Sequence, residues 1–377
     1  MPEIAPKLYT VTRDVEMLVQ RWCRTRPEGQ LAFPPSDVFK ELSDQLTAAL
    51  IAVFAEEAKK YQNYPAFEEK RERGEWSRTE VEFISPEQIR KIISKRDSPI
   101  LSEIASGLPW ITLDRAYCET GQGLDADYCL EVTRLYDLDG CVKIGLGMRP
   151  ESETLDYMGT ALGHAVEKCV GHLSDGTKVV LADDGLYSGS TMAEVVRLLK
   201  QRGIQVRYII TALTRKEGAQ YLDERINDLW ASEDRLTPHP RMFLGMLSPR
   251  DEVRDWVCER DFFVGVPLSG RTVGVMVGTS PIARPHLSDV NKRIVVGIPY
   301  SVVSTNDLQS CASISSGAYT ISRVGLELSL RLWKEMEKIN GDMKFRVKDL
   351  PRTPVPLHKK PDAYVVAELE QMLGSIT

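Results

Sequence analysis

The chain has 377 residues, of which 42% are apolar and 27% are charged, and its formal net charge is −6. A chain of this length and composition can bury a large core, so we expect two or three compact regions. The acidic balance excludes a global basic footprint for nucleic acid or for an anionic membrane. The longest apolar run, LTAALIAVFA at residues 46–55, is about half the length of a membrane helix, so no spanning segment is expected.

Residues 1–100 have the pattern of a helical N-terminal region. Ser36 is placed to cap an amphipathic helix. The apolar positions of this helix are Phe39, Leu42, Leu46, Leu50 and Phe54. The sequence SPEQ at 85–88 is a capping box that predicts a second helix. The charged segment between these helices is typical of a solvated connection.

Residues 101–305 alternate short apolar strands with helical stretches. The expected strands are WITL, VKIGLG, KVVLA, VRYIITAL, DFFVGV, RTVGVMVG and RIVVGIP. This alternation predicts an α/β domain built on a mainly parallel sheet. Residues 306–377 then form an expected C-terminal helical region, with helices near ISRVGLELSLRLWKEMEKI and VVAELEQML and a Pro- and Lys-rich stretch, DLPRTPVPLHKKP.

The segment VVLADDGLYSGST, residues 179–191, carries the clearest chemical signal. An apolar strand runs into two acids and a glycine- and hydroxyl-rich loop, and an amphipathic helix follows that should stop at Gly203. In open parallel sheets this carboxyl edge binds ligands, and the free N–H groups of the following helix attract anions. Glycines allow the backbone to approach a phosphate, and hydroxyls can donate to it. Acids that accept hydrogen bonds from two neighbouring hydroxyls, beside amides that bind a phosphate, are what a ribose 5-phosphate site needs.

These residues resemble the signature of the type I phosphoribosyltransferases, which joins an apolar strand and two acids to a Thr/Ser-Gly-x-Thr loop. The resemblance covers about thirteen residues. It implies that fold, with 5-phosphoribosyl 1-diphosphate (PRPP) as substrate, Mg²⁺ as cofactor, and a place in nucleotide metabolism. The seven cysteines are odd in number and have no paired CxxC spacing, which predicts reduced thiols in a cytoplasm. We also expect a homo-oligomer and no membrane partner.

The resemblance assigns roles to the residues of the loop. Asp183 and Asp184 hold the ribose hydroxyls of PRPP, and the loop binds the 5-phosphate. The expected PRPP-binding residues are Asp183, Asp184, Gly185, Tyr187, Ser188, Gly189, Ser190 and Thr191. Gly185 departs from the family, which prefers an aliphatic residue there. Tyr187 stands where enzymes acting on 6-oxopurines carry an aspartate thought to handle the proton of the base.

A transferase of this type also needs a loop for the diphosphate and a surface for the acceptor. In WITLDRAYCETGQG, Arg115 and the amides around Gly121 are the preferred diphosphate ligands, and Arg149 is the alternative. A surface ion pair is an equal alternative for either arginine. Phe262 and Phe263 are candidates to stack on a flat acceptor, although a core position is the competing interpretation.

Other classes fit the sequence less well. The acids could be the solvated end of a strand, or the acid pair of a receiver domain, but later strands end in TRKEG and PLSG rather than in an aspartate. A P-loop is excluded because no lysine follows the glycines at the required spacing. The five histidines have no metal-ligand spacing, and no cysteine–histidine pair suggests a nucleophile, so no catalytic residue is assigned.

The sequence therefore predicts transfer of ribosyl 5-phosphate from PRPP to a nitrogenous, nucleobase-like acceptor, with release of diphosphate. The alternative is a sensor or effector of the same fold, which binds a ribosyl phosphate or nucleotide without consuming it, as in regulation or phage defence. Only under this alternative is nucleic acid an expected partner.

Overall fold

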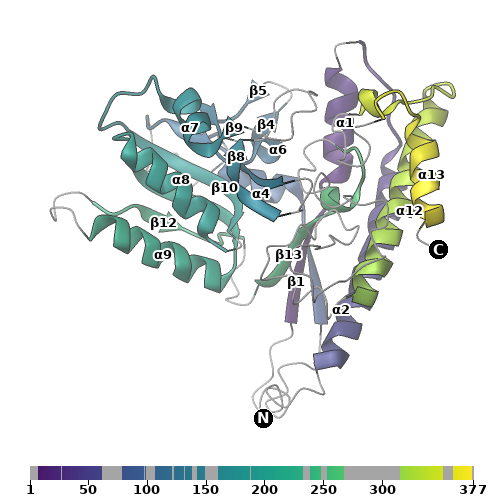
Figure 1. Ribbon diagram of the computed structural model, residues 1–377, viewed down its shortest axis with the longest axis horizontal. Coiled ribbons are helices and arrows are strands. Elements are labelled where there is room, and N and C mark those ends of the chain that lie inside the picture. Colours follow the sequence, from purple (N-terminus) through teal and green to yellow (C-terminus); the bar gives the residue numbers. More distant parts are fainter. Residues whose placement is uncertain are drawn as a thin grey trace.

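The computed structural model describes most of the chain. The described residues are 7–26, 28–61, 79–96, 98, 107–120, 123–130, 132–137, 142–148, 160–186, 188–231, 238–247, 253–266, 315–350 and 360–375. Parallel sheets are covered by helices (Figure 1), so the predicted α/β class is confirmed. The expected strands RTVGVMVG and RIVVGIP and the boundary at residue 305 lie outside these residues. The expected division at residues 100 and 305 stays a prediction.

The larger sheet has five parallel strands in the spatial order β12-β11-β10-β3-β6. Their bounds are β3 Trp110–Thr112, β6 Tyr128–Cys129, β10 Lys178–Leu186, β11 Gln205–Thr214 and β12 Arg241–Phe243. The second strand in the chain, β6, lies on one side of β3, and the third, β10, lies on the other. The strand order therefore reverses between β3 and β10. In open α/β sheets, ligands bind at the carboxyl ends of the strands beside such a reversal.

Strand β10 is buried on both faces because helices cover both. Val180 and Ala182 belong to one hydrophobic core, while Val179 and Leu181 belong to the other. The second of these cores is closed by α7 (Leu162–Val170), α8 (Ser190–Gln201) and α9 (Lys216–Trp230). The first is closed by α1 (Val15–Thr25), α4 (Pro86–Ile93) and the short α6 (Arg115–Cys118). A continuous apolar strand such as KVVLA is the expected sequence for this position.

A second parallel sheet, with the order β13-β1-β2, lies beside the first (Figure 1). Its strands are β1 Lys7–Thr12, β2 Thr79–Ile84 and β13 Val253–Cys258. The N-terminal region, expected to be helical, therefore also supplies two strands. They pair with a strand that follows the larger sheet in the chain, so the N-terminal residues are built into the α/β part of the molecule.

The predicted N-terminal helices are present. Helix α2 (Ser36–Tyr61) buries the predicted positions Phe39, Leu42, Leu46 and Leu50. At the start of α4, Ser85 and Gln88 form the predicted capping box. The two C-terminal helices, α12 (Ser315–Ile339) and α13 (Val365–Ser375), are also present, and α12 packs against α2 and α13 (Figure 1).

Two expected strands differ from the prediction. VKIGLG lies in β8 (Val142–Met148), which forms an antiparallel sheet with β7 (Val132–Asp137) and β9 (Thr160–Ala161). DFFVGV is not a strand, because η2 (Glu259–Phe262), a 3-10 turn, begins directly after β13. The remaining short elements are β4 Glu119–Thr120, β5 Gly123–Leu124 and the 3-10 turn η3 Val347–Asp349.

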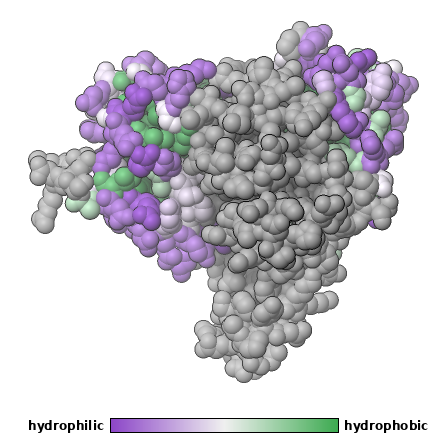
Figure 2. Space-filling model, in the orientation of Figure 1, coloured by the Kyte–Doolittle hydropathy of each residue, from purple (hydrophilic) through white to green (hydrophobic). Residues whose placement is uncertain are grey.

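The described surface is mostly hydrophilic over the outer sides of α8, α9 and α13, with a few hydrophobic residues between (Figure 2). Large exposed apolar side chains among the described residues are Ile51, Phe83, Met343 and Tyr364, which come from separate elements. Within the described residues, no helix is both long and apolar enough to cross a membrane.

Candidate functional site

Asp183 and Asp184, called the motif acids below, lie at the carboxyl end of β10. The strand continues past the acids to Leu186, because Asp183 pairs with Thr211 and Leu186 with Thr214 of β11. Asp184 is buried, and Asp183 is partly buried. The link from β10 to α8 is therefore only three residues long, residues 187–189. Only the end of β10 and this link separate the acids from the first turn of α8, a twelve-residue helix.

Gly189 is the residue before the first turn of α8 and has φ +73°. An L-residue with a side chain rarely adopts this left-handed conformation, so glycine is required by the backbone here. The hydroxyls of Ser188 and Ser190 lie 2.9 Å apart on either side of it. Ser188 is exposed, and Ser190 and Thr191 are half-buried. Hydroxyls and helix-start amides therefore lie together around Gly189, the arrangement that suits a phosphate.

The loop after β3 lies at the same edge of the sheet. Leu113 N donates to Ala182 O at 2.8 Å, which continues the β3–β10 pairing to the position of the acids. Asp114 follows, and its Oδ1 accepts from Ala116 N at 2.5 Å, which fixes the carboxyl at the start of α6. Arg115 is the first residue of α6, directly after Asp114, in the segment predicted to hold diphosphate. Gly121 and Arg149 lie outside the described residues.

A buried arginine that the sequence analysis did not single out occupies the centre of this edge. Arg260 Nη2 lies 2.9 Å from Asp114 Oδ2 and 3.3 Å from Asp184 Oδ2. Arg260 Nε lies 3.3 Å from Asp14 Oδ2, and the Arg260 backbone N donates to Asp14 Oδ1 at 3.0 Å. Asp14 Oδ2 also accepts from the hydroxyl of Tyr117 at 3.0 Å. These contacts bring together residues from four separate parts of the chain.

The acids of this cluster outnumber its single cation. Burial, and then the charge of Asp114, raise the pKa of Asp183 to about 7. Burial and the charges of Asp114 and Asp183 raise the pKa of Asp184 well above its ordinary value, and Arg260 opposes both shifts. Burial disfavours the charge of Arg260, but the neighbouring acids outweigh this and raise its pKa further. Perturbed carboxyls at a sheet edge are typical of functional sites.

The aromatic candidates for acceptor binding are in the core. Phe262 and Phe263 are each 1% exposed, at the end of η2 and just beyond it. This position favours the competing interpretation that they are packing residues, and their stacking on an acceptor stays a prediction. Tyr187 lies outside the described residues. Local sequence could not locate Arg260, because its partners Asp14 and Asp114 are 246 and 146 positions away.

The carboxyls do not form a ready-made metal site. No group of three or more His, Cys, Asp or Glu side chains among the described residues is arranged to hold a metal ion. Mg²⁺ commonly binds through substrate phosphates and water, with only one or two carboxylates. The described donors therefore fit a magnesium ion that arrives with diphosphate, and not one held by the protein alone.

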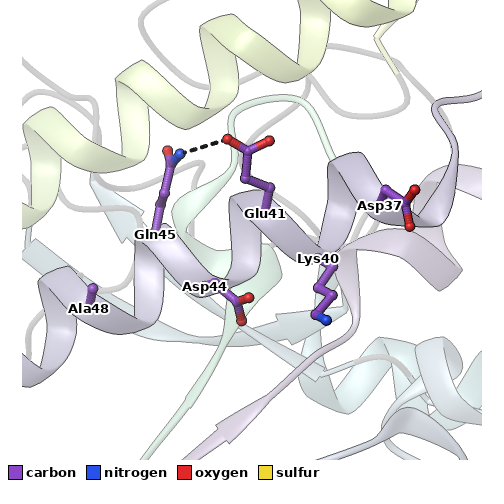
Figure 3. A pocket seen from close by; sticks show the side chains of 6 residues that line it. All are labelled: Asp37, Lys40, Glu41, Asp44, Gln45 and Ala48. Carbon is purple, nitrogen blue, oxygen red and sulfur yellow. Dashed lines mark hydrogen bonds between the residues drawn. The ribbon is translucent and has the colours of Figure 1, made fainter.

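A shallow depression of about 530 Å³ lies along α2, away from these residues (Figure 3). Its lining residues are Asp37, Lys40, Glu41, Asp44, Gln45 and Ala48. Glu41 accepts from Gln45 and pairs with Arg331, and Asp44 pairs with Arg13. Because Glu41 and Asp44 already have partners and none of residues 179–191 lines the depression, we assign it no function.

Comparison with known proteins identifies the region around β10. Residues 157–233 match the family described as the phosphoribosyl transferase domain. A curated relative, the hypoxanthine/guanine phosphoribosyltransferase of Methanotorris igneus, is 25% identical over 153 residues, which cover 38% of this chain and 73% of that protein. No solved structure matches the chain. The residues 157–233 that match the family include Asp183, Asp184 and the loop at 187–189. Asp14, Asp114 and Arg260 lie outside these residues.

Proposed function

We propose that the chain binds PRPP at the carboxyl end of β10, within the residues that match the phosphoribosyl transferase domain, and transfers the ribosyl 5-phosphate to a nitrogenous acceptor. The observation that carries the proposal is that Asp183 and Asp184 lie at the carboxyl end of β10, the strand that leads through a short link into α8. This edge is also where the strand order of the sheet reverses. Acids, hydroxyls and helix amides are therefore within one small region.

Each part of PRPP has matching chemistry in this region. The ionised carboxylates of Asp183 and Asp184 accept hydrogen bonds from the ribose hydroxyls. The Ser188, Ser190 and Thr191 hydroxyls and the first amides of α8 donate to the 5-phosphate. Arg115, on the neighbouring loop, is the proposed ligand of the diphosphate, whose departure leaves positive charge at the anomeric carbon. Magnesium, when bound with the diphosphate, would neutralise the leaving oxygens.

The chain positions reactants and stabilises charge, and the proposal needs no nucleophile. We propose a nucleobase-like acceptor, since the curated relative is named for hypoxanthine and guanine. Tyr187 in place of the expected aspartate argues that proton transfer to the base differs from that in 6-oxopurine enzymes. The homo-oligomer expected from the resemblance stays a prediction.

One observation favours a second candidate function, a sensor that binds a ribosyl phosphate without transfer. Asp184 is already engaged by Arg260 at 3.3 Å, so one ribose-binding acid has an internal partner. Ligand binding would compete with that contact or add to it. The two candidates differ in turnover, because only a transferase releases diphosphate.

The test is incubation of the full-length protein with Mg²⁺ and PRPP carrying label in its diphosphate, together with a panel of purine and pyrimidine bases. Diphosphate release that depends on one base supports the transferase. Binding of PRPP by calorimetry without release for any base supports the sensor. Asp183→Asn should bind PRPP more weakly, and Asp223→Asn, on the exposed side of α9, is the matched control. Absence of PRPP binding by the parent protein would refute both candidates.

A further inference from the structure

Strands of the two parallel sheets end close to one another, at the residues that contact Arg260. Asp114 and Asp184 lie at the carboxyl ends of β3 and β10 in the larger sheet. Asp14 and Arg260 follow β1 and β13 of the smaller sheet. Arg260 is the residue that contacts all three of these acids. The proposed ribose-binding acid is thus held from outside the residues that match the phosphoribosyl transferase family.

The guanidinium of Arg260 is a fixed cation. Its side chain is 7% exposed, and Asp14 binds it twice, through the backbone N and through Nε. The ring of Tyr117 lies beneath it, 5.1 Å from the guanidinium carbon, while the Tyr117 hydroxyl donates to Asp14. The buried Asp14 and the ring of Tyr117 therefore fix the Arg260 side chain independently of Asp114 and Asp184. It therefore meets Asp114 and Asp184 as a rigid group.

The contact between the two sheets converges on one nitrogen. Arg260 Nη2 donates to Asp114 and to Asp184, one acid on each of the two loops proposed to bind PRPP. Without a cation between them, two buried carboxylates at this spacing repel one another and favour the protonated form. The nitrogen Nη1 has no hydrogen-bond partner among the described residues, so the guanidinium also keeps a donor for a ligand oxygen or water.

We propose that Arg260 is a positioning residue for the PRPP site, which fixes Asp184 relative to Asp114 and keeps these acids available as acceptors. The proposal rests on the proposed function of that site. Under this proposal, ligand binding depends on the smaller sheet, which supplies Arg260 and, from the N-terminal region, Asp14. A role limited to fold stability is the alternative, and the two differ in how ligand binding depends on pH.

The pH dependence follows from the charges around the motif acids. Asp114 and Arg260 act on both Asp183 and Asp184, Tyr117 lies close enough to interact with Asp184, and Asp14 pairs with Arg260. Asp114 raises the pKa of both motif acids, and Arg260 lowers it. Loss of the arginine charge therefore raises the pH at which these acids become acceptors. A variant that has lost only stability but is still folded would keep the parental pH midpoint.

The experiment measures ribose 5-phosphate and Mg²⁺–PRPP binding to the full chain by calorimetry, from about pH 6 to about pH 9. The pH midpoint is the pH at which affinity has risen halfway to its plateau. Arg260→Gln should raise this pH midpoint by about one unit and weaken binding about tenfold near neutral pH. Arg260→Lys keeps the charge, so the pH midpoint should stay, but affinity should fall severalfold because a single ammonium cannot replace Nε, which binds Asp14, and also Nη2, which binds Asp114 and Asp184. Circular dichroism establishes that each variant is folded.

The outcomes separate this proposal from the proposed function. If the parent binds neither ligand, both are overturned. If the parent binds and the folded Arg260→Gln variant has the parental affinity and midpoint, only the positioning role is overturned. If Arg260→Gln does not fold, Arg260→Lys decides, because parental affinity in that variant would show that the guanidinium contacts to Asp114 and Asp184 are not needed. A uniform loss at every pH without a midpoint shift in Arg260→Gln would also overturn the role.

Discussion

Gly189, at the start of α8, packs directly against the backbone of Gly218 in α9. A Cβ added at Gly189 would overlap the carbonyl oxygen of Gly218 and lie 3.2 Å from Leu222 N. The glycine therefore does more than expose amides to a phosphate, because it also lets the two helices approach. A bulky substitution at this position changes helix packing before it changes ligand binding.

We predict that Gly189→Ala destabilises the protein more than Gly176→Ala. Both residues have similar positive φ, +73° and +78°, and this conformation costs an alanine about 1–2 kcal/mol. Space around Gly176 is open, whereas Gly189 faces α9, so overpacking should add roughly 1–3 kcal/mol. Thermal unfolding of the two variants measures the difference. Equal losses would contradict the packing contact.

The phosphate cradle is better tested by removing a hydroxyl. Thr191→Val keeps the shape of a half-buried side chain in the first turn of α8. It should weaken ribose 5-phosphate binding by about tenfold, the value of one hydrogen bond to a charged group, and leave the melting temperature nearly unchanged. Thr177→Val, at the amino end of β10, is the control that should bind normally. Parental affinity of Thr191→Val would remove this hydroxyl from the cradle.

How much of this site could be predicted from sequence differs between its parts. Strand β10, the loop and α8 are contiguous, so apolar pattern, acids and glycines specify them locally. Arg260 depends on the pairing of β1 with β13, whose residues are more than two hundred positions apart in the chain. DFFVGV has the composition of a strand, yet Phe262 and Phe263 follow β13 as part of the core. Tertiary pairing, which local pattern does not encode, decides both cases.

Ligand binding should strengthen as pH rises through about 7. Burial raises the pKa of Asp183 to about 7, and only the ionised carboxylate accepts from both ribose hydroxyls. Protonation below that pH removes acceptors, so ribose 5-phosphate affinity should fall as pH decreases. Asp183→Asn is the comparison, since the phosphate of the ligand titrates equally in both proteins. An identical pH profile for parent and variant would show that Asp183 does not contact the ligand.

The cysteines should be reduced and differ in reactivity. Cys23, Cys118, Cys129, Cys169 and Cys258 are free thiols, whereas Cys141 and Cys311 lie outside the described residues. Burial raises the pKa of Cys23 to about 12 and that of Cys169 to about 11. Under native conditions, the partly buried Cys129 and Cys169 should be alkylated before Cys23, Cys118 and Cys258. Mass spectrometry reads the order, and all seven should react after denaturation.

The last prediction concerns Glu259, a buried carboxyl beside the Arg260 cluster. Glu259 is 2% exposed and accepts a hydrogen bond from Ser43 of α2. Burial raises its pKa from 4.5 to about 8, and the charge of Asp14 adds to the shift. The folded protein therefore holds this proton at pH values where the unfolded chain has released it. Stability must fall as pH rises from about 4.5 to about 8, and the loss is complete above that range.

Glu259→Gln removes this titration while keeping the shape and a partner for the Ser43 hydroxyl. The variant should match the parent near pH 5 and exceed it near pH 8 by on the order of a few kcal/mol. Urea unfolding across this range measures the difference. Glu87→Gln, an exposed position on α4, should follow the parent at every pH. If Glu259→Gln instead loses stability at pH 8, the carboxyl is ionised in the folded protein, and the charged Glu259 must be counted among the acids facing Arg260.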